Sequence, residues 1–245
     1  MKSVLLALFF AVTSAYTADS TAPRPRVLVI HGGHGFEKKP FFDMFDQNTN
    51  IVSFTQVMHT KDTSDAYDQS NLYEFDVVVL YDMVQNITEE QKKRFLGLFE
   101  RGIGLVVLHH AIVNYQSWPE YERIIGGTYP EPQDKRGHVT EQLGYEHDVD
   151  IPVKIITKNH PVTAGLTDFD LNDEIYWGYR TTSDVAPLLT TTHRKSGKPL
   201  AWARTEGKSR VVYIQLGHGR TAFKDPNYQK LLSQAITWTG QSKIK

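Results

Sequence analysis

The chain has 245 residues, a formal net charge of −1 and no cysteine. The nearly balanced charge creates no field that would attract nucleic acid or an anionic membrane, so neither is expected as a partner. The absence of cysteine excludes disulfides, thiolate nucleophiles and cysteine-based zinc sites. The length suffices for one large domain with a substantial core.

The first residues have the pattern of a secretory signal peptide. Lys2 provides a short positive start, residues 4–12 form an apolar run too short to span a bilayer, and residues 13–15 are small. A signal peptidase recognises this order of features, so we predict that residues 1–15 are removed, with a cut nearer Ala18 as the alternative.

The predicted signal peptide implies where the mature protein is located and which residues it contains. We predict a secreted or periplasmic protein with no membrane span, in which residues 16–26 form a linker and residues 27–240 form a single domain. An exported protein without disulfides depends on its core for stability. This suits a large bacterial enzyme better than a small extracellular module.

Strand-like and helix-like segments alternate in the first half of the domain. Short apolar, β-branched runs predict strands over residues 27–31, 51–57, 76–81 and 104–109. Helical spacing of phenylalanine and methionine predicts a helix over residues 40–47. A capping box formed by Thr88 and Gln91 predicts the start of another helix, which stops near Gly102. The strand ends recur about every 25 residues, the period of a βα unit, which predicts a doubly wound parallel sheet.

The second half of the domain is rich in strands separated by short turns. The predicted strands cover residues 149–157, 174–179, 186–191, 199–204 and 210–216. Because the turns are short, we expect mixed or antiparallel additions to the same sheet. Apolar residues at helical spacing predict a last helix over residues 228–238. The fold class is therefore α/β, with a mainly parallel central sheet and extra β-strands in the second half.

Histidines stand directly after the apolar runs of three predicted strands. His31 closes the first run, His109 and His110 close the fourth, and His218 follows the last. Ligands bind beyond the carboxyl ends of the strands in open parallel sheets. Histidine is also the side chain best suited to move protons or hold a metal near neutral pH. We therefore predict an active site of clustered imidazoles.

The glycines after His31 form a second candidate feature. Gly32 and Gly33 allow positive φ angles and close backbone approach, so their amides could face a bound substrate beside His31. A tight turn explains them as well. A dinucleotide site is a weaker alternative, because Lys38 stands where the third glycine of that fingerprint would be.

Other polar residues complete the set of candidates. Glu174, predicted at a strand start, could orient a histidine, act as a base or bind sugar hydroxyls. Tyr176 offers area for stacking on a sugar, although core packing explains it equally well. Asp82 ends the third strand and is a further candidate for substrate binding, and His160, which begins a segment, is a weaker one. The remaining histidines of loops and strand flanks are predicted to be ordinary surface groups: His59, His147 and His193.

Stretches spread along the chain together carry a resemblance that none would carry alone. They are VLVIHGGHGF (27–36), GIGLVVLHHA (102–111), WPEY (118–121), IGG (125–127), NHPVT (159–163), DEIY (173–176) and YIQLGHG (213–219). On these stretches the chain resembles the trehalose-utilisation (ThuA-like) family over nearly all of the mature sequence. The resemblance implies a flavodoxin-like three-layer sandwich of the class I glutamine amidotransferase-like type.

The same resemblance bears on the chemistry. In that superfamily a nucleophilic cysteine follows a central strand, and here His109 and His110 occupy its place, with His218 in the place of the superfamily's histidine. Since the chain has no cysteine, glutamine hydrolysis is not expected. Family membership implies a link to carbohydrate utilisation, by analogy.

We therefore expect an exported enzyme acting on a small sugar or keto-sugar derivative by hydrolysis, elimination or isomerisation. His109 or His110 would be the general base, His218 the complementary acid or orienting group, and Glu174 would fix an imidazole or a hydroxyl. One alternative is a non-catalytic carbohydrate-binding or scaffold module of the same fold. Another is a zinc-dependent hydrolase, with ligands drawn from His31, His109, His110, His218 and Glu174. The sequence requires no cofactor, and a homo-oligomer is compatible with it.

Overall fold

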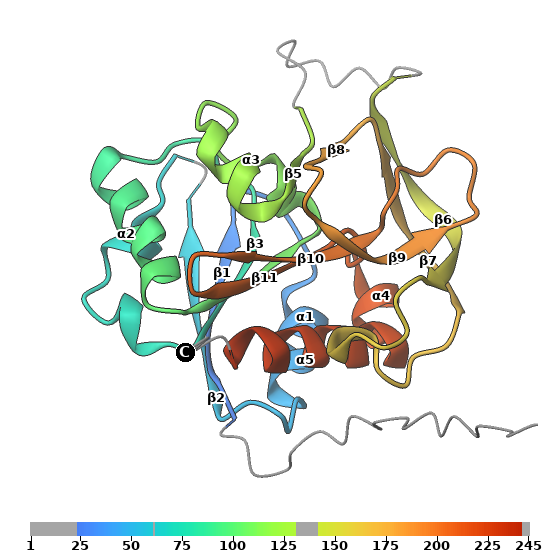
Figure 1. Ribbon diagram of the computed structural model, residues 1–245, viewed down its shortest axis with the longest axis horizontal. Helices are drawn as coiled ribbons and strands as arrows, with labels where there is room; N and C mark the ends of the chain where they lie inside the picture. Colours follow the sequence, from blue (N-terminus) through green and yellow to red (C-terminus); the bar gives the residue numbers. More distant parts are fainter. Residues whose placement is uncertain (1–23, 61, 131–141, 242–245) are drawn as a thin grey trace, which may run out of the picture.

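The computed structural model describes residues 24–60, 62–130 and 142–241. The predicted signal peptide and most of the predicted linker lie outside these residues. A nine-stranded sheet in the order β2-β1-β3-β4-β11-β10-β9-β6-β7 runs through the described part of the chain (Figure 1).

One half of the sheet is parallel, and its inner strands are buried whereas the strand at its outer edge is largely exposed. Its strands are β2 (Ser53–His59), β1 (Arg26–Gly32), β3 (Val77–Asp82), β4 (Gly104–Leu108) and β11 (Ser209–Ile214). The apolar runs that predicted β1, β3 and β4 are almost entirely buried, as expected for strands covered on both faces. Most of the predicted strand boundaries here lie within two residues of those observed.

The other half of the sheet is antiparallel, which confirms the additions expected from the short turns. Its strands are β10 (Ala201–Glu206), β9 (Ala186–Thr191), β6 (Gly144–Ile155) and β7 (Phe169–Trp177). Two short strands, β5 (Gly127–Thr128) and β8 (Arg180–Thr181), pair separately. The position of Glu174 at a strand start was wrong, because β7 begins five residues earlier and Glu174 lies inside it.

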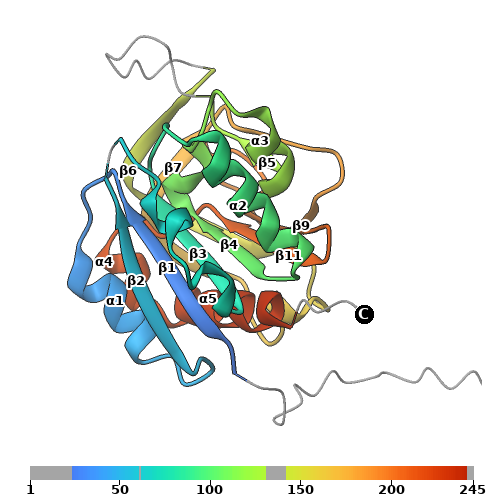
Figure 2. The same ribbon diagram turned by 90° about the vertical axis from the view of Figure 1, so that its left-hand side faces the viewer.

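Helices cover both faces of the sheet and complete the expected three-layer α/β sandwich (Figures 1 and 2). One face carries α1 (Lys38–Asp46), α4 (Arg220–Lys224) and α5 (Pro226–Gly240). The opposite face carries α2 (Glu89–Glu100) and α3 (Pro119–Ile125). Short 3-10 helices join these elements: η1 (Asp65–Asp68), η2 (Leu72–Glu74), η3 (His109–Val113) and η4 (Pro161–Thr163). Neither α3 nor α4 was predicted.

The capping box that predicted the start of α2 is present. The Thr88 hydroxyl oxygen accepts from the Gln91 amide at 3.2 Å, and the Gln91 side-chain oxygen accepts from the Thr88 amide at 3.0 Å. These bonds satisfy two amides that a helix start otherwise leaves without partners. Among the described residues, no helix combines the length and the apolar character that crossing a bilayer requires.

Candidate functional site

His109 stands at the tip of β4 in an uncommon backbone conformation. Its φ angle is 49°, in the left-handed region that residues with a side chain rarely adopt. The Tyr213 hydroxyl donates to the His109 carbonyl at 3.1 Å. The His109 Nδ1–H donates to the Gln215 carbonyl at 2.7 Å. Strained residues of this kind persist where the surroundings fix them, and they concentrate at functional sites.

His218 reaches the same edge of the sheet from the loop after β11. Gly217, with a φ angle of +113°, turns the chain there. The Asp173 carboxylate accepts the backbone N–H of Gly217 at 2.6 Å and that of His218 at 3.0 Å. The Tyr81 hydroxyl donates to the Gly217 carbonyl at 2.9 Å. The loop is thus held from β7 and from β3.

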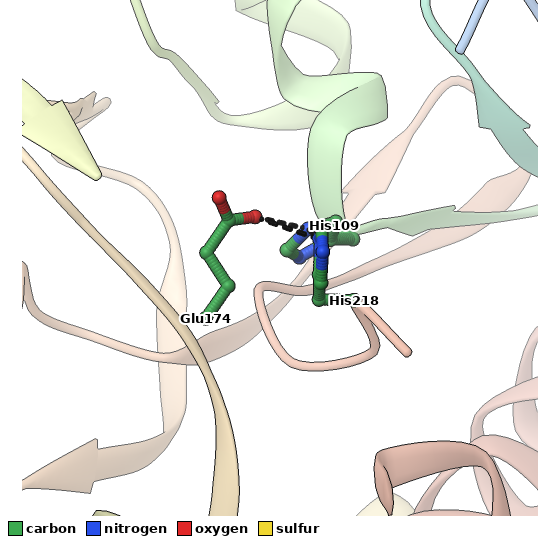
Figure 3. A group of neighbouring side chains, drawn as sticks. All are labelled: His109, Glu174 and His218. Carbon is green, nitrogen blue, oxygen red and sulfur yellow. Dashed lines mark hydrogen bonds and ion pairs between the residues drawn. The ribbon is translucent and has the colours of Figure 1, made fainter. Parts of the chain in front are cut away.

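Glu174 joins the two histidines from the antiparallel half of the sheet. Its carbonyl accepts from Gln215 Nε2 at 2.7 Å, which ties β7 to the chain after β11. Its carboxylate oxygen Oε2 lies 2.7 Å from His109 Nε2 and 3.0 Å from His218 Nδ1. The two nitrogens are 3.2 Å apart. Figure 3 shows the Glu174 carboxylate directed at both imidazoles. We call these three residues the His–Glu–His cluster.

Tyr176 and His147 border the cluster. The Tyr176 hydroxyl lies 2.8 Å from His109 Nε2, and its ring stacks on the His109 ring. His147 Nδ1 lies 3.3 Å from the other carboxylate oxygen of Glu174, Oε1. The His147 side chain is 48% exposed, whereas that of Glu174 is only 5% exposed. His147 therefore stands on the solvent side of the cluster.

A β-bulge explains why His147 faces the site. The pairing of β6 with β7 shifts register between Glu146 and Val149, and Asp148 has a φ angle of 56°. Bulges of this kind re-aim side chains next to active sites. His147 lies at the surface, as predicted, but it also borders Glu174, and only the pairing of β6 with β7 reveals that place.

The members of the cluster shift one another's pKa values. Burial opposes ionisation of Glu174, but the hydrogen bonds from His109 and His218 outweigh burial and hold the pKa of the carboxyl well below its usual range. The hydrogen bond to Glu174 raises the pKa of His218, against the opposing effect of burial. Burial raises the pKa of Tyr176 well above its usual value, so its phenol keeps its proton. The site thus combines a carboxylate, two imidazoles and a neutral phenol.

His110 lies next to the cluster without joining it. Its ring is buried, and within the described part of the chain neither of its nitrogens has a hydrogen-bonding partner. Burial lowers its pKa well below the usual value. The ring packs against His34, with the centroids 4.5 Å apart, and the His34 ring also approaches His218 at 6.3 Å. Of the two neighbouring histidines, the structure therefore brings His109 to Glu174.

His31 and its glycines lie at the same edge but contact other groups. The His31 ring packs against Phe36 and Phe42. Gly32 and Gly33 have positive φ angles of 120° and 71°, as expected. A Cβ at Gly32 would lie 2.0 Å from the His59 carbonyl oxygen, and one at Gly33 would lie 2.0 Å from that of Met83. Glycine is therefore required at both positions because the neighbouring backbone at His59 and Met83 comes so close.

Asp82 belongs to a separate buried network. One carboxylate oxygen lies 2.8 Å from His59 Nδ1, and the other accepts from the Asn114 amide at 2.8 Å. The Ala66 amide donates to His59 Nε2 at 3.1 Å. The prediction of His59 as a surface group was wrong, because it is 1% exposed. The structure does not bring Asp82 to the His–Glu–His cluster.

His160 lies at the opposite edge of the sheet. Its ring packs against Trp238, with the centroids 4.6 Å apart, and Trp238 also carries the Arg210 guanidinium on its ring. Arg210 stands near the amino end of β11, whereas His218 follows the carboxyl end of that strand. The structure thus separates His160 from the other predicted site residues.

One family pattern, described as ThuA, trehalose utilisation, matches residues 26–239. The chain belongs to the ThuA family. The match covers nearly all of the predicted domain and confirms the resemblance seen in the sequence. Membership of this family indicates a role related to carbohydrates. No curated protein matches the sequence.

Solved structures of the ThuA family share the fold. A ThuA-like protein from Parabacteroides merdae superposes with a TM-score of 0.74 at 21% identity, over 91% of each chain. One from Bacteroides uniformis gives a TM-score of 0.63 at 21% identity, over 92% of this chain and 95% of that chain. A β-galactosidase from Bacillus circulans gives a TM-score of 0.55 at 12% identity, over 89% of this chain and 31% of the enzyme. At these identities the likeness concerns the fold alone.

Proposed function

We propose that this ThuA family member is an exported enzyme that acts on a sugar or keto-sugar derivative by hydrolysis, elimination or isomerisation. The His–Glu–His cluster would be its reaction centre. The observation that carries the proposal is the meeting of His109, Glu174 and His218 within 3.2 Å of one another, from positions 109, 174 and 218 of the chain. Packing alone gives no reason for such a concentration of polar groups, since each must give up water.

The position of the cluster supports an active site. It lies beyond the carboxyl ends of β4 and β11, where open parallel sheets bind their ligands. The His218 side chain is 32% exposed, so a ligand can approach the cluster from that side. The family description, trehalose utilisation, supports a carbohydrate as that ligand.

The residues present suit chemistry on a hydroxyl or carbonyl group. The two imidazoles can accept or donate a proton, and the ionised Glu174 carboxylate orients both of them through Oε2. The neutral phenol of Tyr176 can donate a hydrogen bond to a substrate oxygen next to His109. His147, on the solvent side, can contact a sugar hydroxyl. We assign the role of His109 or His110 to His109, because its Nε2 reaches Glu174.

A substrate panel tests this proposal. Trehalose, other disaccharides and their keto derivatives would be incubated with the wild type and with the E174Q and H218A variants. We expect turnover of at least one compound by the wild type, with kcat/KM at least about 100-fold lower in both variants.

Two variants provide matched controls. E206Q makes the same change at a carboxylate that pairs with Arg123 at the opposite edge, and H160N removes a histidine far from the cluster. Both are expected to keep the wild-type kcat/KM. Equal activity in E174Q, H218A and the controls would contradict the proposed centre. Sugar binding without turnover of any compound would instead favour a binding module.

A further inference from the structure

We propose that the His–Glu–His cluster binds one divalent transition-metal ion of the zinc type, through His109 Nε2, His218 Nδ1 and Glu174 Oε2. The ligand atoms that these residues offer lie within 4.8 Å of one another. The inference deepens the proposed function, because it assigns a cofactor class to the same centre. Metal binding is nevertheless measurable without a substrate.

The hydrogen bonds of His109 leave one nitrogen lone pair facing the cluster. Nδ1 lies 2.7 Å from the Gln215 carbonyl oxygen, which can only accept, so Nδ1 carries the proton. In the neutral ring Nε2 is then an acceptor. It lies 2.7 Å from the Glu174 carboxylate oxygen, another acceptor, and 2.8 Å from the Tyr176 hydroxyl, which can donate to it. The 2.7 Å contact between Nε2 and the carboxylate oxygen is satisfied either by a proton on Nε2 or by a cation that binds both atoms.

The spacing of the three atoms suits a single ion. They are 2.7, 3.0 and 3.2 Å apart. Ligands held at about 2.0–2.2 Å from one zinc ion, on neighbouring corners of its coordination shell, lie about 3.0–3.5 Å from each other. Small movements of the side chains would bring all three atoms into this range. Protons on the two imidazoles satisfy the two contacts to Glu174 but leave the two nitrogens 3.2 Å apart, whereas one metal ion binds all three atoms.

Each ligand is oriented by an outer hydrogen bond. The Gln215 carbonyl fixes the tautomer of His109, the Asp173 carboxylate holds the backbone of His218, and the Gln215 amide holds the carbonyl of Glu174. Such outer partners commonly position metal-binding imidazoles and carboxylates. His109 and Glu174 are almost fully buried, with side chains 1% and 5% exposed, so the cluster is preformed within the fold.

The donor set selects the class of ion. Two imidazole nitrogens and one carboxylate oxygen suit zinc and neighbouring first-row metals, whereas calcium and magnesium prefer oxygen ligands alone. Three protein ligands leave coordination positions for water or a substrate oxygen, as in catalytic rather than structural zinc sites. The exposed side of His218, next to His147, is where such a ligand would enter.

Calorimetric titration of zinc into the full-length protein, after treatment with a chelator, tests the inference. We expect one zinc ion per chain in the wild type. E174Q and H218A should bind at least about tenfold more weakly, while E206Q and H160N should bind like the wild type. Titration of cobalt(II) gives an independent readout, because nitrogen and oxygen ligands in a site of low coordination number produce visible absorption bands. These bands should be lost in E174Q.

Thermal unfolding distinguishes a variant that is folded but cannot bind zinc from one that does not fold. Zinc should raise the melting temperature of the wild type and of both control variants but not that of E174Q, because only the bound native state is stabilised. Sub-stoichiometric binding by the wild type, or equal affinity in the wild type and E174Q, would overturn the inference. The proposed enzymatic function fails separately, if no sugar compound is turned over by either the zinc-loaded or the chelator-treated protein.

Discussion

Asp173 holds His218 in place through the backbone: its carboxylate accepts the amides of both Gly217 and His218, at 2.6 and 3.0 Å. Asp173 is the neighbour of Glu174 in β7, so one strand supplies both the carboxylate of the cluster and the support of the loop opposite. The neighbouring residues Asp173 and Glu174 thus have different roles. Asp173 contacts no ring of the cluster and acts as a positioning residue.

Replacing Asp173 by Asn should loosen His218. One side-chain oxygen becomes an NH2 group that cannot accept from a backbone amide, and the loss at this buried position should cost about 1–3 kcal/mol. We expect D173N to lower kcat far more than it raises KM, since the residue does not touch substrate. Denaturant unfolding and steady-state kinetics measure the two effects. D170N, at an exposed position of the same strand, is the matched control and should change neither.

The network of Asp82, His59 and Asn114 should prove structural. All three side chains are buried, and the two hydrogen bonds to the Asp82 carboxylate are both 2.8 Å long. Leaving buried hydrogen-bonding groups of this network without a partner costs about 1–3 kcal/mol. We therefore expect D82N to lower the free energy of unfolding strongly while kcat/KM stays at the wild-type level at temperatures where the variant is folded. A selective loss of kcat/KM would instead place Asp82 in substrate binding. D43N, at an exposed ion pair with Lys39, should cost less than about 0.5 kcal/mol.

The capping box of α2 gives a prediction unrelated to the site. T88A removes the side-chain oxygen that accepts from the Gln91 amide and should lower the free energy of unfolding by about 1 kcal/mol. T167A, also at an exposed threonine, is the control and should stay within about 0.5 kcal/mol of the wild type. Urea unfolding distinguishes them. Equal stability of the two variants would show that the cap contributes nothing measurable.

His160 should make stability sensitive to acid. Burial and the nearby Arg210 lower the pKa of His160, whose Nδ1 accepts from the Val162 amide in the neutral form. As pH falls below about 6.5, the unfolded chain takes up this proton more readily than the folded protein, so stability is lost. In H160N the amide oxygen can accept from Val162 without titrating. The stability advantage of the wild type over H160N should therefore shrink between pH 7.5 and pH 5. An advantage that stays constant or grows would contradict this assignment.

Local patterns were enough to predict the parallel half of the sheet. Runs of buried, β-branched residues mark β1, β3, β4 and β11, and the positions of His109 after β4 and of His218 after β11 follow directly from those runs. β7 was misplaced because its first residues alternate apolar side chains with Asp and Asn, which strands usually avoid. The strand forms because Phe169 and Leu171 pack into the core on one face.

The members of the site that depend on pairing could not be predicted. His147 faces Glu174 only because a bulge shifts β6 against β7, and no local signal in the sequence marks that register. The burial of His59 depends on Asp82, which lies 23 positions away in the chain. The separation of His160 from the cluster likewise follows from the direction of β11 and not from any feature around residue 160.

A crystal structure of E174Q with a bound sugar or keto-sugar tests most directly whether the His–Glu–His cluster is the reaction centre. We predict a sugar oxygen within about 3.2 Å of His109 Nε2 or His218 Nδ1, with His147 at the rim. A sugar bound elsewhere, for example in the hollow between Tyr73, Arg101 and Gly240 at the opposite edge of the sheet, with nothing at the cluster, would contradict the account.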